Sequence, residues 1–226
     1  MQESQKPGVA ASPGEAPFLA GDGEMAQLMR DLDWSRTPVG PVDRWPQSLR
    51  TAVSICLASR HPIEIWWGPE YARLYNDAYR PILGATKHPQ FLGRPGRDCW
   101  SEIWDVIGPM LDGVRATGKA TWSEDFQLIL SRNGYQEETY FTFSYAPVLV
   151  EDGTVGGIFC ACAETTGRVL SERRLRALRA LGAQSAAAAM VSAEETIARS
   201  VSTLVESSAD VPFALAYMIE PGGAAA

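Results

Sequence analysis

The chain has 226 residues, of which 46% are hydrophobic and 21% are charged, and its formal net charge is -7 at neutral pH. This composition is that of an ordinary globular protein with one full domain and flanking segments, or with two small domains. The acidic balance, and the absence of a basic patch interleaved with aromatic side chains, argue against a nucleic-acid-binding protein.

No apolar stretch of the sequence approaches the ~20 residues that span a bilayer, and the first residues lack the pattern of a secretory signal. We therefore expect a cytoplasmic protein whose cysteines are thiols. Cys160 and Cys162 occupy alternate positions of one predicted strand, so their side chains should face the same side. Two such ligands without a further Cys or His pair make a poor zinc site, and we expect no metal.

The N-terminal part of the chain is predicted to be a leader followed by a helical extension. Residues 1–23 are rich in Pro, Gly, Ala and Ser, which is typical of a disordered segment. Residues 24–61 hold two helical patterns separated by a turn-rich link. The second helix carries a single apolar stripe that should pack on a sheet: Leu49, Ala52, Val53, Cys56 and Leu57.

From residue 62 onward the pattern is that of a sheet with short helices. The predicted strands are β-branched or aromatic runs bounded by turns, at residues 63–67, 72–76, 121–131, 137–150 and 154–163. Helical spacing occurs between them at residues 77–83 and 100–117, where Pro109 should kink or split the longer helix. The predicted fold is α+β, with five antiparallel strands in one sheet, helices on one face and a flanking helix on the other.

The last predicted strand passes into a charged helix through Glu164-Thr165-Thr166. Residues 167–192 contain strong helix formers and no Pro, so a long helix should leave the domain here. A strand that feeds directly into a long polar helix suits a sensory domain that acts on a segment further along the chain. We assign the relay of a signal to Glu164, Thr166 and Arg168, and we expect Glu164 to pair with Arg168 or with an arginine of a partner helix.

The exit helix also has the spacing of a two-chain seam. Apolar and small residues recur at intervals of three and four, namely Leu178, Leu181, Ser185, Ala188 and Ser192. We expect a parallel homodimer through this helix. The alternative is a monomer whose helix folds back.

The chain resembles a PAS domain over about residues 62–166. The resemblance rests on IEIWWGPEYARLYNDAY, on FLGRPGRDCWSEIW and on GIFCACAETT, where Glu164-Thr165-Thr166 is similar to the Asp-x-Thr junction of such domains. More narrowly, Trp34 to Thr51 resembles the W-x-x-T-P-x-G-P…W-P-x-S-L-R-T segment that precedes the PAS core in bacterial PAS–GAF sensor histidine kinases. Residues 193–226 resemble the truncated start of a GAF domain, with a helix followed by a strand at residues 212–219.

The resemblance implies a PAS-like five-stranded sheet, dimerisation through flanking helices, and input sensing for downstream GAF and kinase domains of a parent protein. The run from Gly96 to Ser101, with Cys99 in fourth position, is similar in part to the flavin-binding motif G-R-x-C-R-F-L-Q of light-sensing relatives. The Phe-Leu-Gln continuation is missing, so a flavin sensor is a minor alternative, and a haem sensor is another. The cofactor is unknown, and none is expected.

The sequence lacks the signatures of a catalytic domain. His61 and His88 are its histidines, neither lies on the exit helix, and no glycine-rich phosphate loop opens a helix. The acidic pairs Glu124-Asp125 and Glu137-Glu138 are strand neighbours that point to opposite faces, so neither pair can share a proton. We therefore predict that this chain is not an enzyme.

Aromatic residues are the remaining clue to a binding site. Phe141, Phe143 and Tyr145 share one face of their predicted strand, which should be the core face. Ligand pockets are apolar clefts with a few polar groups, and eight residues of this region form a candidate pocket: Trp66, Tyr75, Tyr79, Cys99, Trp104, Phe126, Phe141 and Phe143. The simpler interpretation, preferred on the sequence alone, is that these rings only fill the core.

The sequence thus predicts a sensory input module of a bacterial signal-transduction protein, which relays a ligand or conformational signal through its exit helix. The alternative is a protein-interaction or dimerisation module that binds no small ligand. Neither a nucleic-acid partner nor membrane insertion is expected.

Overall fold

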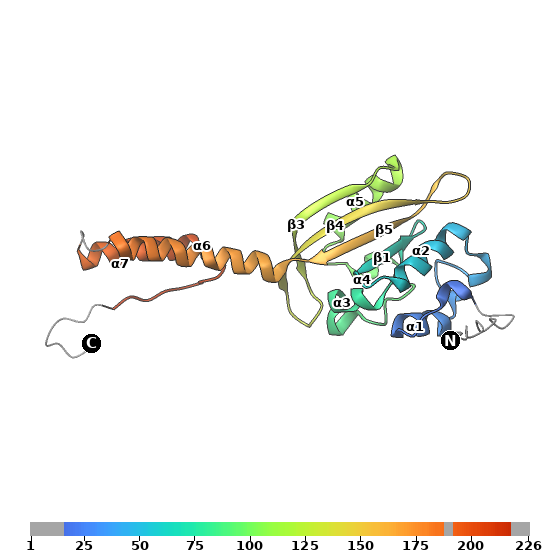
Figure 1. The fold of residues 1–226 in the computed structure, drawn as a ribbon, viewed down its shortest axis with the longest axis horizontal. Coiled ribbons are helices and arrows are strands. Elements are labelled where there is room, and N and C mark those ends of the chain that lie inside the picture. Colours follow the sequence, from blue (N-terminus) through green and yellow to red (C-terminus); the bar gives the residue numbers. More distant parts are fainter. Residues whose placement is uncertain (1–15, 188–191, 218–226) are drawn as a thin grey trace, which may run out of the picture. The chain divides into compact units, whose positions relative to one another are not determined.

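The computed structural model describes residues 16–187 and 192–217. The chain divides into two compact units, Met1–Thr166 and Gly167–Ala226. The first unit contains one five-stranded antiparallel sheet in the order β2-β1-β5-β4-β3, with helices on both faces (Figure 1). The predicted α+β class and the predicted five-stranded sheet are confirmed.

The elements follow the chain in an order close to the predicted one. The strands are β1 (Ile63–Trp67), β2 (Ala72–Tyr75), β3 (Thr121–Leu130), β4 (Glu137–Leu149) and β5 (Val155–Glu164). The α-helices are α1 (Glu24–Asp31), α2 (Gln47–Ala58), α3 (Arg80–Lys87), α4 (Gly96–Cys99), α5 (Trp104–Thr117), α6 (Thr166–Ala187) and α7 (Ala193–Glu206). Short 3-10 helices are η1 (Pro17–Leu19), η2 (Trp34–Arg36), η3 (Val42–Arg44) and η4 (Asp77–Tyr79). No helix in these described ranges is both long and apolar enough to cross a membrane.

The N-terminal extension is folded over a longer stretch than the sequence predicted. Residues 1–15 of the predicted leader lie outside the described residues, but η1 is formed and Leu19 is buried. Phe18 packs on Trp45 with 5.7 Å between the ring centroids, and Arg30 donates a hydrogen bond to the Leu19 carbonyl oxygen at 2.7 Å. The prediction of disorder up to residue 23 is wrong here, because Phe18 and Leu19 bury apolar surface that a disordered segment would leave in water.

Helix α2 covers one face of the sheet. Its buried side chains belong to the predicted stripe: Leu49, Ala52, Val53 and Cys56. They face β1 and β4, which α2 contacts. The full burial of a side chain such as Leu49 stabilises the fold by about 1.5–3 kcal/mol, so this stripe fixes the helix on the sheet.

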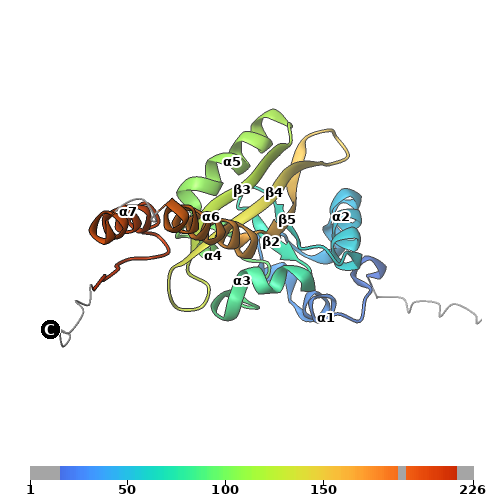
Figure 2. The ribbon, with the colours of Figure 1, turned by 60° about the vertical axis from the view of Figure 1, so that its left-hand side comes forward.

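The other face of the sheet packs against the helices that follow β2. Helix α5 contacts β4 and β5, and Figure 2 shows α5 and α2 on opposite sides of the sheet. Phe141, Phe143 and Tyr145 of β4 are all buried, which confirms the predicted core face. Cys160 and Cys162 of β5 are buried on the same face.

Two predicted helices have different bounds in the structure. Helix α5 begins at Trp104 rather than Trp100, and Pro109 lies inside it without dividing it. The hydrogen bond that Pro109 cannot make would be accepted by the carbonyl group of Asp105, and both residues are exposed, so water can supply the missing donor. The helix predicted at residues 77–83 continues to Lys87 across a kink at Gly84, where φ is 61°.

The second unit is a hairpin in which α7 runs back along α6 (Figures 1 and 2). Arg173 of α6 forms a two-point ion pair with Asp210, just beyond α7, at 2.5 and 2.9 Å. Helix α7 agrees with the predicted helix, but residues 212–217 form no strand, and residues 218–219 lie outside the described residues. The strand prediction is wrong for 212–217, because the described residues of this unit supply no neighbouring strand for backbone pairing.

The hairpin bears on the predicted dimer seam. Leu178 is 64% exposed, whereas Ala188 lies outside the described residues. The described partner of α6 within this unit is α7 of the same chain, which is the folded-back arrangement that the sequence left open as the alternative. The homodimer remains a prediction.

Asn76 joins the end of β2 to the segment between α2 and β1. Its Oδ1 accepts hydrogen bonds from the backbone N–H groups of Ile63 and Tyr79, each at 3.1 Å. Its Nδ2 donates to the carbonyl oxygens of Cys56, Ser59 and His61, at 3.1, 3.0 and 2.8 Å. As predicted, Asn76 ends a strand and caps the following helix, and it is buried.

We predict that Asn76→Ala lowers the free energy of unfolding by about 3 kcal/mol, because each buried polar group left unpaired costs about 1–3 kcal/mol. Urea denaturation followed by tryptophan fluorescence measures the change. The matched control is Asn133→Ala in the exposed β3–β4 turn, which should cost less than about 1 kcal/mol. Equal losses for the two variants would contradict the prediction.

Candidate functional site

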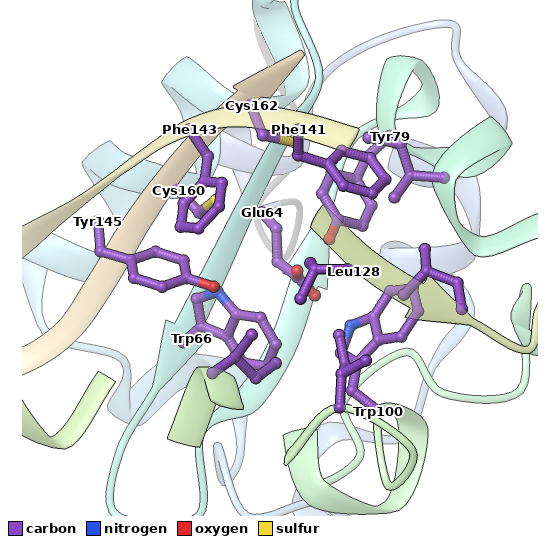
Figure 3. A pocket seen from close by; sticks show the side chains of 14 residues that line it. Glu64, Trp66, Tyr79, Trp100, Leu128, Phe141, Phe143, Tyr145, Cys160 and Cys162 are labelled. Carbon is purple, nitrogen blue, oxygen red and sulfur yellow. The ribbon is translucent and has the colours of Figure 1, made fainter. Parts of the chain in front are cut away.

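A cavity lies between the sheet and helices α3 to α5 (Figure 3), and we call it the core cavity. Its lining residues come from β1, β3, β4 and β5, from η4, α3 and α5, and from the segment between α4 and α5: Glu64, Trp66, Tyr79, Ile82, Trp100, Ile103, Ile107, Leu128, Leu130, Phe141, Phe143, Tyr145, Cys160 and Cys162. Its volume is about 40 Å³. One water molecule needs about 10–15 Å³ of such a cavity, so there is room for about three waters or for a molecule of about four non-hydrogen atoms.

Half of the predicted pocket residues line the core cavity, namely Trp66, Tyr79, Phe141 and Phe143. The other four lie behind the lining. Tyr75 and Cys99 are buried next to Arg73, Trp104 packs on Trp66 with 6.3 Å between the ring centroids, and Phe126 packs edge-on against Phe143 at 5.9 Å. These four side chains support lining residues and do not themselves border the space.

The core cavity contains a charged residue that the sequence analysis did not select, Glu64 of β1. Both Glu64 and Arg73 of β2 are 0% exposed, and Arg73 Nε donates a hydrogen bond to Glu64 Oε1. The strand register pairs Glu64 with Tyr75 and Trp66 with Arg73, which places the ion pair diagonally across the hairpin on the cavity face. The sequence did contain a signal for this pair: each of the two aromatic strands of the predicted hairpin carries one charged residue, Glu64 in the first and Arg73 in the second.

Aromatic rings and a thiol surround the Arg73 guanidinium. Its central carbon lies within cation–π range of three ring centroids, at 5.3 Å from Trp100, 5.5 Å from Trp66 and 5.6 Å from Tyr75. Its Nη1 donates to Cys99 Sγ. Burial disfavours the charge of Arg73, but the Glu64 carboxylate more than compensates and holds the pKa of Arg73 above its ordinary value. Arg73 is therefore a permanent buried cation.

Burial also governs the acidic groups of this cluster. It raises the pKa of Glu64, and the Arg73 guanidinium and the Tyr79 hydroxyl group oppose that rise. Burial raises the pKa of the Cys99 thiol to about 11, against the opposing charge of Arg73. Cys99 is thus a thiol at neutral pH and lacks the thiolate character of reactive cysteines.

The core cavity does not suit a large cofactor. Pockets for drug-sized ligands measure about 300–1,000 Å³, many times the space found here, so neither a flavin nor a haem fits this arrangement. His88 lies outside the lining, with its Nδ1 3.0 Å from the Tyr75 hydroxyl oxygen and its Nε2 3.1 Å from Glu24 Oε1 of α1. His61 is exposed. Within the part of the chain that the structure describes, no three His, Cys, Asp or Glu side chains are grouped to hold a metal ion.

The junction at Glu164 and Thr166 is tied to the domain by Arg132, which lies in the β3–β4 loop. Arg132 Nη1 and Nη2 donate to Glu164 Oε2 and Oε1 at 2.8 and 2.9 Å. Thr166 Oγ1 donates to Glu164 Oε1 at 2.9 Å and accepts from the backbone N–H of Tyr140 at 2.9 Å. Partial burial would raise the pKa of Glu164, but the hydrogen bonds and charge of Arg132 lower it below its usual range.

Glu164 thus pairs with Arg132, which the sequence analysis did not select, and a pair with an arginine of a partner helix stays a prediction. Arg168 forms an ion pair with Glu172, one helical turn further along α6, at 3.1 Å. The sequence offered no signal for Arg132, because it approaches Glu164 from a hairpin loop 32 residues earlier in the chain.

Arg132 also contacts α3, whose Ile82 lines the core cavity. Arg132 Nη1 lies 3.4 and 3.5 Å from the carbonyl oxygens of Pro81 and Ile82, and the Arg132 carbonyl oxygen accepts from the Thr86 N–H at 3.1 Å. Gly84 permits this approach, since a Cβ there would lie 2.5 Å from the Arg132 carbonyl oxygen. One side chain thus joins a wall of the cavity to Glu164 at the end of β5.

No protein-family model matches the chain, and no curated protein matches it. Solved structures similar to it include an RNA-binding light-oxygen-voltage receptor (18% identity, TM-score 0.43), the Rhodobacter sphaeroides LOV protein (14%, 0.44) and the PAS domain of Bordetella pertussis BvgS (19%, 0.43). These matches cover 63%, 74% and 59% of this chain, and 40%, 95% and 97% of the respective structures. Because these TM-scores are below 0.5, the PAS-like fold rests on the sheet and its flanking helices and not on the matches.

We predict that Arg73→Gln destabilises the chain by about 3–5 kcal/mol at pH 8, because it leaves the Glu64 carboxylate buried without its counter-ion. The pKa of Glu64, already raised by burial, then rises further in the folded state. The folded chain binds more protons than the unfolded chain between the two pKa values, so stability falls as pH rises, by up to about 1.4 kcal/mol per pH unit. Denaturant unfolding at pH 5 and pH 8 measures this dependence.

The double variant Glu64→Gln/Arg73→Gln is the matched control, since it removes both charges and keeps the shapes of the side chains similar. It should be more stable at pH 8 than the single variant and should lose the added pH dependence. A single variant whose stability rises from pH 5 to pH 8 would show that Glu64 does not carry the effect.

Proposed function

We propose that this chain is a sensory input module, in which the state of the core cavity is transmitted through Arg132 to the exit helix. The observation that carries the proposal is the set of contacts made by Arg132. It touches the backbone of Ile82, which lines the cavity, and it forms a two-point ion pair with Glu164, the last residue of β5 before α6.

The proposed relay works in three steps. A change in the occupant of the core cavity moves Ile82 and the part of α3 around it. The hydrogen bonds between α3 and the loop at Arg132 carry this movement to the guanidinium group. The ion pair then shifts the preferred positions of Glu164 and Thr166, and with them the first turn of α6. A coupling free energy of about 1–3 kcal/mol is enough to change the equilibrium between two positions of this turn five-fold or more.

The identity of the parent protein is proposed from the resemblance of the sequence to PAS–GAF sensor histidine kinases. We propose a bacterial two-component sensor histidine kinase of the cytoplasm as the parent protein, with GAF and kinase domains downstream as the output. This chain would contribute no catalytic residue, and the sensor would need no large cofactor. A parallel homodimer through α6 would transmit the change to the output domains. Leu175 and Leu178 are exposed on that helix and would supply apolar contacts to the second copy.

A second candidate is an interaction module without a small ligand. It is favoured by the small size of the core cavity and by an apolar depression between α2 and β4, where Ile55 is 56% and Leu149 52% exposed. Native mass spectrometry of the purified chain separates the two candidates, since a retained small molecule favours ligand sensing.

We predict that Arg132→Gln uncouples α6 from the core cavity. Leu128→Phe serves as the perturbation, because the larger ring takes up cavity space next to Glu64. Leu128→Phe should change the hydrogen-exchange protection of residues 168–175 about five-fold or more in the otherwise unmodified chain, and much less when combined with Arg132→Gln.

The control is Arg60→Gln, which removes an exposed arginine before β1 and should preserve the effect of Leu128→Phe. If Leu128→Phe has the same effect on α6 with and without Arg132, the relay through this arginine is wrong.

For the dimer, we predict that Leu178→Glu converts a dimer into a monomer, because it places a charge in an apolar helix contact. Multi-angle light scattering of the full chain measures the mass. Val106→Glu, at a similarly exposed apolar position on α5, should leave the mass unchanged. A mass that Leu178→Glu does not alter rules out this part of α6 as the interface.

A further inference from the structure

The core cavity contains polar atoms that the protein itself leaves unpaired. Among the described residues, Glu64 Oε2 and Trp66 Nε1 have no hydrogen-bond partner of ordinary geometry. The Tyr79 hydroxyl group lies in the same lining and opposes the rise of the Glu64 pKa, so it is the protein group nearest to serving the carboxylate. Glu64 is 0% exposed and Trp66 is 1% exposed, so bulk water does not reach them. A buried polar atom without a partner is costly, which makes two such atoms on one small cavity a mark of a binding site.

The two groups are complementary in hydrogen bonding. The indole Nε1 can only donate, and the free oxygen of the Glu64 carboxylate accepts. Figure 3 shows the Glu64 carboxylate among the cavity side chains and the Trp66 indole beside it, with the Tyr145 hydroxyl turned toward the indole. An occupant that satisfies both groups needs one acceptor and one donor.

The charge balance and the volume of the core cavity restrict the kind of molecule that can occupy it. The Glu64 charge is already balanced by Arg73, so a charged occupant would add an unpaired charge to a mostly apolar space. The remaining lining is almost entirely aliphatic, aromatic or thiol, and the space of about 40 Å³ admits about four non-hydrogen atoms. A molecule of this size binds no tighter than on the order of tens of micromolar.

We propose that the core cavity binds a small neutral molecule of about four non-hydrogen atoms that carries both a hydrogen-bond donor and an acceptor, such as a short amide or hydroxy-carbonyl compound. The donor of the molecule meets Glu64 Oε2, and its acceptor meets Trp66 Nε1–H. This inference rests on the proposed sensory function and names the ligand class of its site.

Three probes of nearly equal shape test the ligand class. Acetamide has a donor and an acceptor, acetone has an acceptor only, and acetamidinium has donors and a positive charge. The ¹⁵N-labelled full chain is titrated with each, and the indole N–H signal of Trp66 is followed after assignment by its loss in Trp66→Phe. Acetamide should shift this signal saturably at submillimolar to millimolar concentration, and the other two probes should bind at least ten-fold more weakly.

Variants locate the binding. Leu128→Phe should weaken acetamide binding at least ten-fold. In Trp66→Phe the indole signal is lost, so binding is followed through the signals of other lining residues, and it should also be at least ten-fold weaker. The matched control is Trp122→Phe, which removes an indole that is 68% exposed on β3 and should leave the affinity unchanged. Because Leu128→Phe and Trp66→Phe alter the cavity in opposite ways, a folding defect in one leaves the other as a test.

Equal binding of acetone, preference for acetamidinium, or the absence of any saturable shift would each overturn the proposed ligand class. The last result would mean that the cavity holds only water. Failure of the proposed ligand class would not decide the Arg132 experiment, because Arg132 can couple Leu128 to α6 whatever molecule occupies the cavity. Acetamide binding with no such coupling would keep the site and reject the sensory relay.

Discussion

The buried ion pair between Glu64 and Arg73 is the constraint on which the core of the first unit depends. Two charges removed from water cost several kcal/mol each, so they persist only where surrounding groups compensate for lost hydration. Here the compensation comes from Trp66, Tyr75 and Trp100 around the guanidinium, and from the thiol of Cys99. The aromatic residues of this core therefore stabilise a charge as well as fill space.

The ion pair also shapes the core cavity. One carboxylate oxygen of Glu64 is committed to Arg73, and the other borders the cavity without a described protein partner. Apolar side chains gain nothing by packing onto that oxygen, because they would bury it unpaired. A small polar space in an otherwise apolar core is the physical result, and it gives the cavity its selectivity for a hydrogen-bonding occupant.

A second ion pair, between Arg132 and Glu164, lies at the edge of the same core. It is partly exposed, so its contribution to stability is modest, but its two-point geometry fixes the position of the junction. The two pairs have different roles. The Glu64–Arg73 pair holds the core around the cavity, whereas the Arg132–Glu164 pair joins a cavity wall to the end of β5.

Much of the fold was predictable because local patterns agree with the tertiary structure. The alternation of Phe141, Phe143 and Tyr145 gave the core face, Asn133-Gly134 gave the hairpin turn, and the stripe from Leu49 to Cys56 gave the helix that covers the sheet. The misses involve contacts between distant segments. Phe18 and Leu19 are ordered only because the extension offers them a place to pack, and residues 212–217 form no strand without a described neighbour.

The sequence by itself determined the α+β class, the order of the elements and the strand-to-helix junction, because each of these depends on patterns of residues that are close together along the chain. Only the tertiary structure decided which side chains border the cavity and which lie one layer behind. It also paired Glu64 with Arg73 across a hairpin and brought Arg132 to Glu164 from 32 residues away. The physical reason is that periodicity fixes the face on which a side chain lies, whereas hydrogen-bond partners depend on how loops and strands meet in space.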